Sequence, residues 1–285
     1  MVIIIISSVL RSITDGLENK SVSQITYYIT YILIVTIVMK NFSDIINMVK
    51  TSIDNLVAFT NCLIPLLITL MITTGNIASA GMLQPIILWI ISFIGNFINV
   101  VLVPASLISV ALSVISNVSD RVPIDKLSKY INTTVVWILG IVLTIFVGVS
   151  SLEGSITNGV DALTVKPQKR QFQILFRLLE RYSGDAVDTV MSCSNILKNA
   201  VGIVGVIIIL SICIIPIIKL TTLMAVYYLG SALCQPIADD KIVKLLGQIG
   251  GTFKLLLAIM CSISVMLIIG VTLVIKISNS GVMMQ

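Results

Sequence analysis

The side chains of this chain that could do chemistry are few, and their spacing assembles no reaction centre. No histidine occurs among the 285 residues, which excludes an HExxH zinc site, a Ser–His dyad and a histidine-ligated haem. No P-loop GxxxxGK[ST] is present, and Gly159-Val160-Asp161 does not match the GxGD of intramembrane aspartyl proteases. We therefore predict that the protein is not an enzyme and has no catalytic residue, no metal-binding residue and no cofactor.

The five cysteines do not form a redox or metal motif. They are odd in number, form no CxxC pair and lie mostly in apolar stretches, where cysteine behaves as a small hydrophobic residue. We interpret them as structural thiols. They are Cys62, Cys193, Cys213, Cys234 and Cys261.

Polar residues inside the apolar stretches leave two interpretations open. Asn96, Asn99, Gln84 and Gln235 could line a pore or make hydrogen bonds between helices. A coupled carrier keeps an ionisable group near the middle of the bilayer. Here lysines such as Lys198 fall at the ends of apolar stretches, where their ammonium groups would extend toward the interface. The pattern favours a packed scaffold or a passive conduit over a pump.

The type of secondary structure that positions these side chains depends on whether the chain folds in water or in a lipid bilayer. From Asn55 to Ser119 there are 65 residues without a charged side chain. Hydrophobic residues make up 57% of the chain, charged residues 11%, and the mean hydropathy is +1.09. Continuous apolar runs exclude a transmembrane barrel, whose strands alternate, and helices satisfy every backbone group in lipid. The sequence predicts an all-α polytopic membrane protein.

Charges between the apolar runs divide the chain into about seven transmembrane or re-entrant helices of the length that a bilayer requires. We expect Pro65 to break the second helix and Pro104 to divide the third run into a kinked or re-entrant pair. The predicted runs are Ile25–Met39, Leu56–Thr73, Pro85–Val118, Tyr130–Leu152, Ala200–Ile218, Leu220–Leu233 and Leu255–Ile275.

The predicted domain organisation is simple. Residues 1–24 form a short N-terminal segment, and residues 25–279 form a single helical membrane domain. Within it, residues 153–199 are an extramembrane or interfacial segment, because they hold the only long polar stretch. The net charge of +5 is thinly spread, which argues against nucleic acid as a partner. The expected partners are the lipid bilayer, other membrane proteins and, as a further option, a second copy of the chain.

An internal repeat would give the chain duplicated halves. Cys62-Leu63-Ile64-Pro65 and Cys213-Ile214-Ile215-Pro216 are each followed by a Gln-Pro-Ile sequence, and the two sets are offset by 151 residues. Many transporters are built from such repeats with broken helices. A small-solute permease is therefore the alternative prediction. The structural and packing candidates are Pro65, Gln84, Pro85, Pro104, Lys198, Gly202, Gly205, Pro216, Gln235 and Pro236.

Several segments resemble the stage III sporulation protein AE family of endospore-forming bacteria. The similarity follows the chain in order, and LKNAVGIVG after GDAVDTV is fairly specific. The resemblance implies a multi-spanning protein of the mother-cell membrane around the forespore. It also implies membership of a channel-like complex, with other membrane proteins, that late forespore gene expression requires. The matching segments are 63–70 (LIPLLITL), 80–85 (AGMLQP), 112–121 (LSVISNVSDR), 137–149 (WILGIVLTIFVGV) with Asp161, 184–190, 197–205 and 235–237 (QPI).

Two departures from the family pattern stand out. Family members begin with a signal peptide and an extracytoplasmic segment, so we expect this chain to start from an internal position. Residues 167–183 (PQKRQFQILFRLLERYS) also differ from the family. A back-translation of Gln173 to Ser183 read in the neighbouring frame gives the family-like NFIPIVGKIL. We interpret 167–183 as a local frameshift, and the alternative is a divergent basic amphipathic helix. Sequencing the DNA over these codons distinguishes the two.

Overall fold

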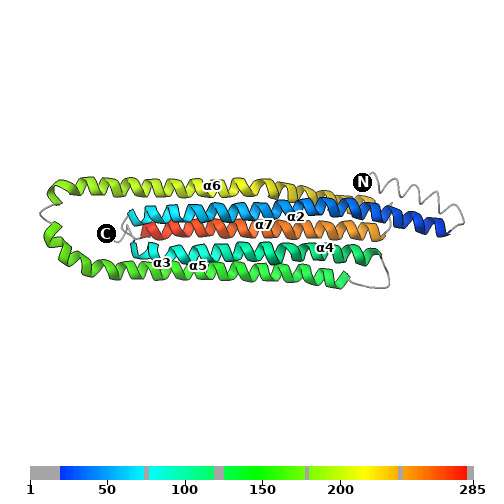
Figure 1. The fold of residues 1–285 in the computed structure, drawn as a ribbon, viewed down its shortest axis with the longest axis horizontal. Helices are drawn as coiled ribbons and strands as arrows, with labels where there is room; N and C mark the ends of the chain where they lie inside the picture. Colours follow the sequence, from blue (N-terminus) through cyan, green and yellow to red (C-terminus); the bar gives the residue numbers. More distant parts are fainter. Residues whose placement is uncertain (1–19, 74–76, 119–124, 177–179, 237–239, 281–285) are drawn as a thin grey trace. The chain divides into compact units, whose positions relative to one another are not determined.

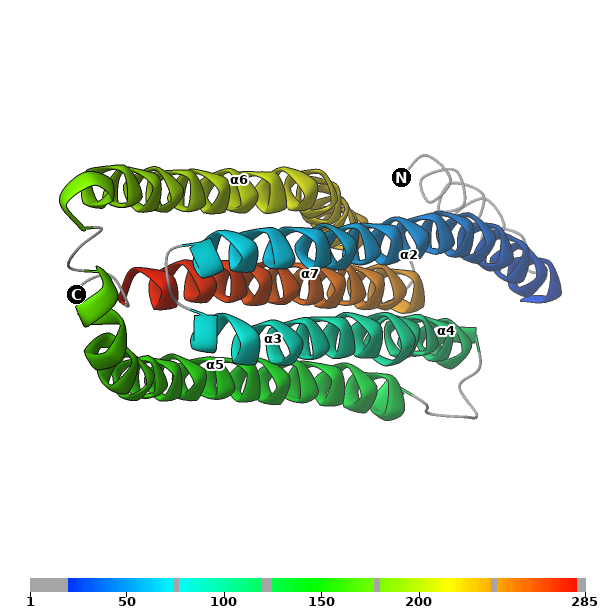
Figure 2. The same cartoon turned by 60° about the vertical axis from the view of Figure 1, so that its left-hand side comes forward.

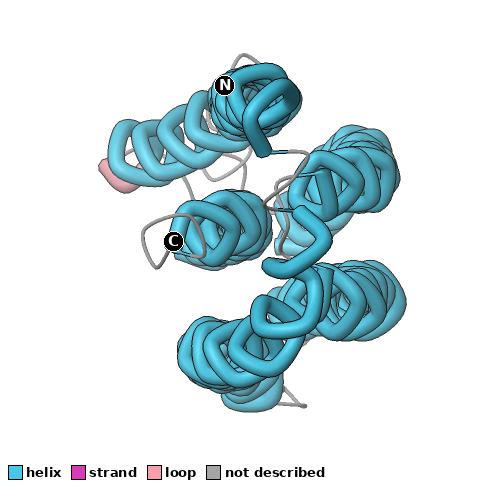
Figure 3. Tube along the Cα trace, turned by 90° about the vertical axis from the view of Figure 1, so that its left-hand side faces the viewer, coloured by secondary structure: helices cyan, strands magenta, loops and turns pink. Residues whose placement is uncertain are grey.

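The computed structural model describes residues 20–73, 77–118, 125–176, 180–236 and 240–280. Within these ranges the chain forms helices and one turn, at Gln235-Pro236, and no strand (Figure 3). The all-α prediction is confirmed for this part of the chain. The side chains of residues 152–188 are outside the described set, so the predicted frameshift at 167–183 and the predicted interfacial position of residues 153–199 stay predictions.

Five long helical runs make up the described chain (Figure 1). The second run consists of two α-helices joined by a π-helix without interruption. The elements are α2 (Lys20–Thr73), α3 (Ile77–Phe97), the π-helix η1 (Ile98–Leu102), α4 (Val103–Val118), α5 (Asp125–Phe176), α6 (Glu180–Cys234) and α7 (Asp240–Ser280).

Each run contains a stretch that is long and apolar enough to cross a membrane. Among the described residues these stretches are Tyr31–Thr73, Pro85–Asn117, Lys126–Ser151, Ser192–Cys234 and Asp240–Lys276. Seven separate spans are therefore not observed. The first and second predicted spans lie in the single helix α2, and the fifth and sixth lie in α6. A stretch of 43 residues, as in α2 and α6, is about 65 Å long. A hydrocarbon core is only about 30 Å thick.

The prolines do not break these helices as predicted. Pro65 and Pro216 lie inside α2 and α6, which continue through them. Before Pro104 the backbone widens into η1, whose end is marked by a hydrogen bond from the Val103 N–H to the Ile98 carbonyl. Proline lacks an N–H and its ring clashes with the carbonyl four residues earlier, and a π-turn relieves this by re-spacing the carbonyls. The expected kinked or re-entrant pair is instead one continuous run.

The chain divides into two compact units, to which all five runs contribute. Unit 1 contains Met1–Ser52, Phe97–Leu139 and Ile214–Cys261. Unit 2 contains Ile53–Asn96, Gly140–Cys213 and Ser262–Gln285.

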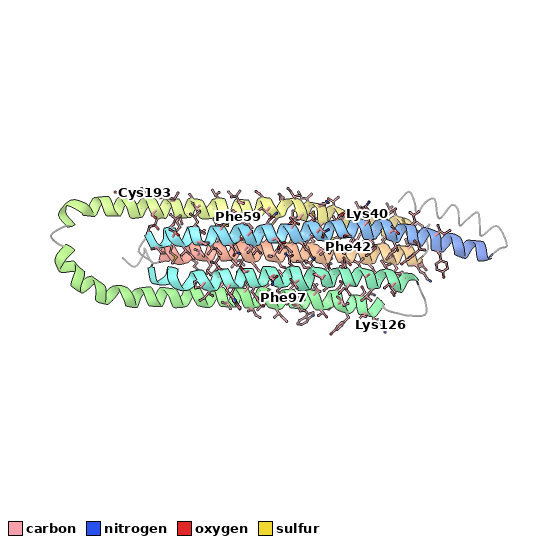
Figure 4. All side chains as sticks on the ribbon, in the orientation of Figure 1. Lys40, Phe42, Phe59, Phe97, Lys126 and Cys193 are labelled. Atoms are coloured by element: carbon pink, nitrogen blue, oxygen red, sulfur yellow. The ribbon has the colours of Figure 1, made fainter. Side chains whose placement is uncertain are left out.

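Aromatic side chains form the centre of unit 1. The Phe253 ring of α7 lies 5.5 Å from the Phe42 ring of α2 and 5.2 Å from the Tyr227 ring of α6, measured between centroids. Phe42 and Phe253 are almost completely buried, and Figure 4 labels Phe42 on α2. Tyr31 of α2 donates a 2.7 Å hydrogen bond from its hydroxyl to the Val114 carbonyl of α4. The phenol thus packs in an apolar core while its polar end is satisfied.

Glycines set the packing of unit 2. In this unit α6 runs beside α2 (Figures 1 and 2), and a Cβ atom at Gly205 would overlap the Leu63 side chain. A Cβ at Gly202 would overlap Ile275 of α7, and one at Gly95 of α3 would overlap Val57 of α2. Small residues that allow close backbone approach are how helices associate in lipid.

Candidate functional site

A row of polar side chains, all buried except the half-buried Gln248, crosses three helices of unit 1, and we name it the polar seam. Its members are Ser109, Ser113 and Asn117 on α4, Ser128 on α5 and Gln248 on α7. The Ser128 hydroxyl oxygen lies 2.9 Å from that of Ser109 and 2.7 Å from that of Ser113. Asn117 donates from Nδ2 to Oε1 of Gln248 at 2.7 Å. The α4 residues recur every fourth position, which places them on one helix face.

The polar seam is chemically neutral. It contains hydroxyls and amides but no carboxylate, imidazole or ammonium, so it has no group suited to acid–base chemistry at neutral pH. Its members hydrogen-bond to one another and to helix carbonyls, as when Ser128 donates to the Ser109 carbonyl at 2.9 Å. Hydrogen bonds of this kind hold transmembrane helices together. The seam can therefore join α4, α5 and α7 in unit 1.

Lys198 occupies an unexpected position in unit 2. Its side chain is 0% exposed, and its Nζ donates to Oδ1 of Asn195 at 3.1 Å. Ser194 is the residue before Asn195 on α6, and its hydroxyl oxygen lies 2.5 Å from that of Thr73 on α2. The sequence led us to expect an ammonium extended toward the interface; the side chain is instead covered by protein, and its Nζ points back along α6 toward Asn195, near the start of the apolar stretch.

The burial of Lys198 follows from its place on α6. It lies four residues before Gly202 and seven before Gly205, the spacing of one helix face. That face continues with buried residues every three or four positions. They are Ile209, Cys213, Pro216 and Leu220. The spacing of Lys198, Gly202 and Gly205 in the segment LKNAVGIVG could have predicted this burial, because it places the three residues on one helix face.

The other structural candidates are not gathered at one place. Pro85 is exposed on α3, and Gln235 and Pro236 are exposed in the turn after α6. Gln84 lies within α3, and its side chain is outside the described set. The two Gln-Pro pairs thus occupy a helix and a turn respectively. If the two halves were repeated in structure, both Gln-Pro pairs would lie at the same place in corresponding elements, and they do not.

Two asparagines named from the sequence have different surroundings. Asn99 donates from Nδ2 to the Lys50 carbonyl of α2 in a long hydrogen bond of 3.5 Å. Asn96 is exposed. For Asn99, the structure thus agrees with the interpretation of a hydrogen bond between helices. Sequence inspection missed the polar seam, although the repeated spacing from Ser109 to Asn117 was visible.

The remaining reactive groups are dispersed within the described part of the chain. No group of three or more His, Cys, Asp or Glu side chains there could hold a metal ion. The five cysteines are thiols rather than disulfides, and Cys193 lies exposed on α6 (Figure 4). The Cys213 sulfur accepts a hydrogen bond from the Ser264 hydroxyl at 2.7 Å. The described geometry supports packing and helix association as the chemistry of this chain.

Comparison with known proteins agrees with the resemblance seen in the sequence. The family model described as stage III sporulation protein AE matches residues 1–278. Stage III sporulation protein AE of Bacillus subtilis (strain 168) is 29% identical over 277 residues, which cover 97% of this chain and 69% of that protein. No solved structure matches the chain.

Proposed function

Because the chain belongs to the stage III sporulation protein AE family, we propose that it is a multi-spanning component of a sporulation-specific membrane complex. The complex would be a channel or secretion-like assembly between mother cell and forespore, required for late forespore gene expression. The observation that carries the proposal is the family match over almost the whole chain. The five long apolar helices support a position in the membrane.

The proposed location is the mother-cell membrane that surrounds the forespore. The proposed partners are the lipid bilayer, other membrane proteins of the same complex and, as a further option, a second copy of this chain. A role in packing and pore formation rather than catalysis is supported by the neutral polar seam and by the glycine contacts of unit 2. Nucleic acid is not among the proposed partners.

An in-frame deletion in the source organism tests this function. The strain would be scored for vegetative growth, engulfment of the forespore and a late forespore reporter. We expect normal growth and forespores that stall after engulfment, with the reporter silent. Reintroducing the intact gene should restore the reporter. A growth or uptake defect without a sporulation block would contradict the proposal.

A small-solute permease is the second candidate. It is favoured by the repeated Cys-x-x-Pro sequences, which the structure places in the interiors of the corresponding long helices α2 and α6. The two candidates differ in timing. A sporulation component would accumulate only after asymmetric division, whereas a nutrient permease would be present in growing cells.

The number of crossings remains a proposal of seven, in which the charges of α2 and Lys219 of α6 each divide a helix into two crossings. In α6 the second crossing would be short, because the helix continues for only 15 residues after Lys219, to Cys234. Lys126 at the start of α5 and Lys244 near the start of α7 distinguish the alternatives. Five crossings place both residues on the same side of the membrane, since two spans separate them. Seven crossings place them on opposite sides.

Single cysteines at these two positions, in a chain otherwise free of cysteine, would report the sidedness. Both lysines are exposed, so a membrane-impermeant maleimide should reach each from one side. Labelling of both from the same side of sealed vesicles would reject seven crossings.

A further inference from the structure

An apolar groove runs along unit 2 between α3 and α5, which are neighbours in Figures 1 and 2. Its volume is about 700 Å³, within the range of sites that hold a small molecule. Every residue of its lining is apolar. The lining residues are Pro85, Ile86, Trp89, Ile90, Phe93 and Ile94 from α3, and Val142, Ile145, Phe146 and Val149 from α5.

Two aromatic rings form part of the groove wall. The rings of Trp89 and Phe93 are stacked, with centroids 5.4 Å apart and an interplanar angle of 15°. Trp89 is 67% exposed and Phe93 is 56% exposed, so both rings present large apolar faces to their surroundings. Ile145 on α5 is also largely exposed.

The base of the groove is held by α7. The buried ring of Phe146 lies against Gly270, where a Cβ atom would be 3.7 Å from Cζ of the ring. The same Cβ would be 3.6 Å from Cδ1 of Ile91 on α3. Through these contacts α3 and α5 pack against the same glycine of α7.

The length of the groove matches one leaflet of a membrane. It extends from Pro85 to Ile94 on α3, a rise of about 14 Å, which is close to half of a hydrocarbon core of about 30 Å. At one end the sequence becomes polar, with Gln84 before Pro85 on α3 and Ser150, Ser151 and Glu153 after Val149 on α5. At the other end, Ile94 and Val142, both helices continue through uncharged residues. The groove therefore starts at the polar edge of the two apolar stretches and ends inside them, after a length close to one leaflet.

We infer that the α3–α5 groove binds one acyl chain of a membrane lipid, with the headgroup at the end marked by Pro85 and Val149. A helix from a partner or from a second copy would contact a face along both leaflets, about 20 residues, whereas this groove covers half of that length. The uniformly apolar lining gives a polar solute no hydrogen-bond partner. A hydrocarbon chain fills the groove without such a cost.

Lipid retention by the purified full chain tests the inference. The protein would be prepared in dodecyl maltoside with dioleoyl phosphatidylglycerol and examined by native mass spectrometry. We expect one lipid to remain after the loosely held lipids are removed. Val142→Phe and Ile86→Phe fill the groove from its two walls and should each lower occupancy roughly tenfold. Ile141→Phe is the matched control, because Ile141 is exposed on α5 outside the lining and should retain the lipid.

The two tryptophans of the chain locate the bound lipid. Trp89 lines the groove, whereas Trp137 is 70% exposed on α5 and lies outside it. Each tryptophan would be the single one in its variant, Trp89 in Trp137→Phe and Trp137 in Trp89→Phe. Both variants would be titrated with phosphatidylglycerol whose acyl chains carry bromine. Quenching of Trp89 should saturate near one lipid per chain, and quenching of Trp137 should rise gradually without saturation.

Three results would overturn the inference. One is equal and gradual quenching of both tryptophans, which indicates only the ordinary lipid layer around the helices. Another is full lipid retention by both groove-filling variants in folded, monodisperse form. The third is the absence of any quenching of Trp89 by lipid, together with cross-linking of the chain to a second copy through the groove.

Discussion

Unit 1 and unit 2 differ in their most prominent contacts between helices, although the same helices supply both. In unit 1 the helices are joined by the hydrogen bonds of the polar seam and by aromatic contacts around Phe253. In unit 2 they approach closely at Gly95, Gly202 and Gly205. Polar hydrogen bonds and small residues are the two main means of helix association in lipid. Unit 2 also has hydrogen bonds between helices, at Thr73–Ser194 and Ser264–Cys213, so the difference is one of emphasis: the closest glycine contacts lie in unit 2 and the polar seam lies in unit 1.

The largest effect should come from removing the aromatic centre of unit 1. Phe253→Ala deletes a ring that contacts two other rings and is almost completely buried, and should destabilise the protein by about 3 kcal/mol through the cavity left behind. The measurement is the melting temperature in dodecyl maltoside. Trp137→Ala is the control, because this exposed ring should matter far less. An unchanged melting temperature for Phe253→Ala would show that the aromatic cluster does not hold unit 1.

Glycine packing in unit 2 should give the next largest effect. Gly205→Leu places a branched side chain against Leu63 of α2 and should cost about 2 kcal/mol by overpacking. The matched control is Gly148→Leu on α5, where a Cβ atom meets nothing within 4 Å. Thermal unfolding of the two purified variants measures the difference. Equal stability of the two variants would remove the distinction drawn between the units.

The buried ammonium of unit 2 should respond to loss of its neighbour. Asn195→Leu removes a hydrogen bond from a fully buried Lys198 and should destabilise by about 1.5 kcal/mol, since bonds to charged groups are the strong ones. Adding Lys198→Met should recover part of that loss, because the charge is removed together with its partner. A double-mutant cycle measures this coupling. Strictly additive effects would mean that the two side chains do not act together.

The smallest effect is expected in the polar seam of unit 1. Ser128→Ala removes the hydroxyl that both Ser109 and Ser113 contact, and should cost about 0.6 kcal/mol, the average for a hydrogen bond between transmembrane helices. Thr133→Val is the control, because its exposed hydroxyl bonds only within its own helix. Both would be compared by chemical unfolding in detergent. A larger loss for Thr133→Val than for Ser128→Ala would argue against the seam as a link between helices.

Particular residues show how far the sequence could be interpreted before the fold was known. The uncharged run from Asn55 to Ser119 requires a bilayer, and a bilayer requires helices, so the fold class followed directly. The break expected at Pro65 did not follow. A proline inside a helix removes one hydrogen bond, and the neighbouring packing of α2 decides whether the helix continues. The same holds for the π-helix before Pro104.

By itself the sequence determined the solvent, the helical class and the family of this protein, because hydropathy and order along the chain are local properties. The tertiary structure decided which polar groups meet. Asn117 and Gln248 are 131 positions apart, and nothing local predicts that they share a hydrogen bond. It also decided that Lys198 faces inward, since a lysine at the end of an apolar run extends toward water or into the bundle according to the helix face on which it lies. Pairing and facing depend on the packing of whole helices, and that packing is fixed only when the chain folds.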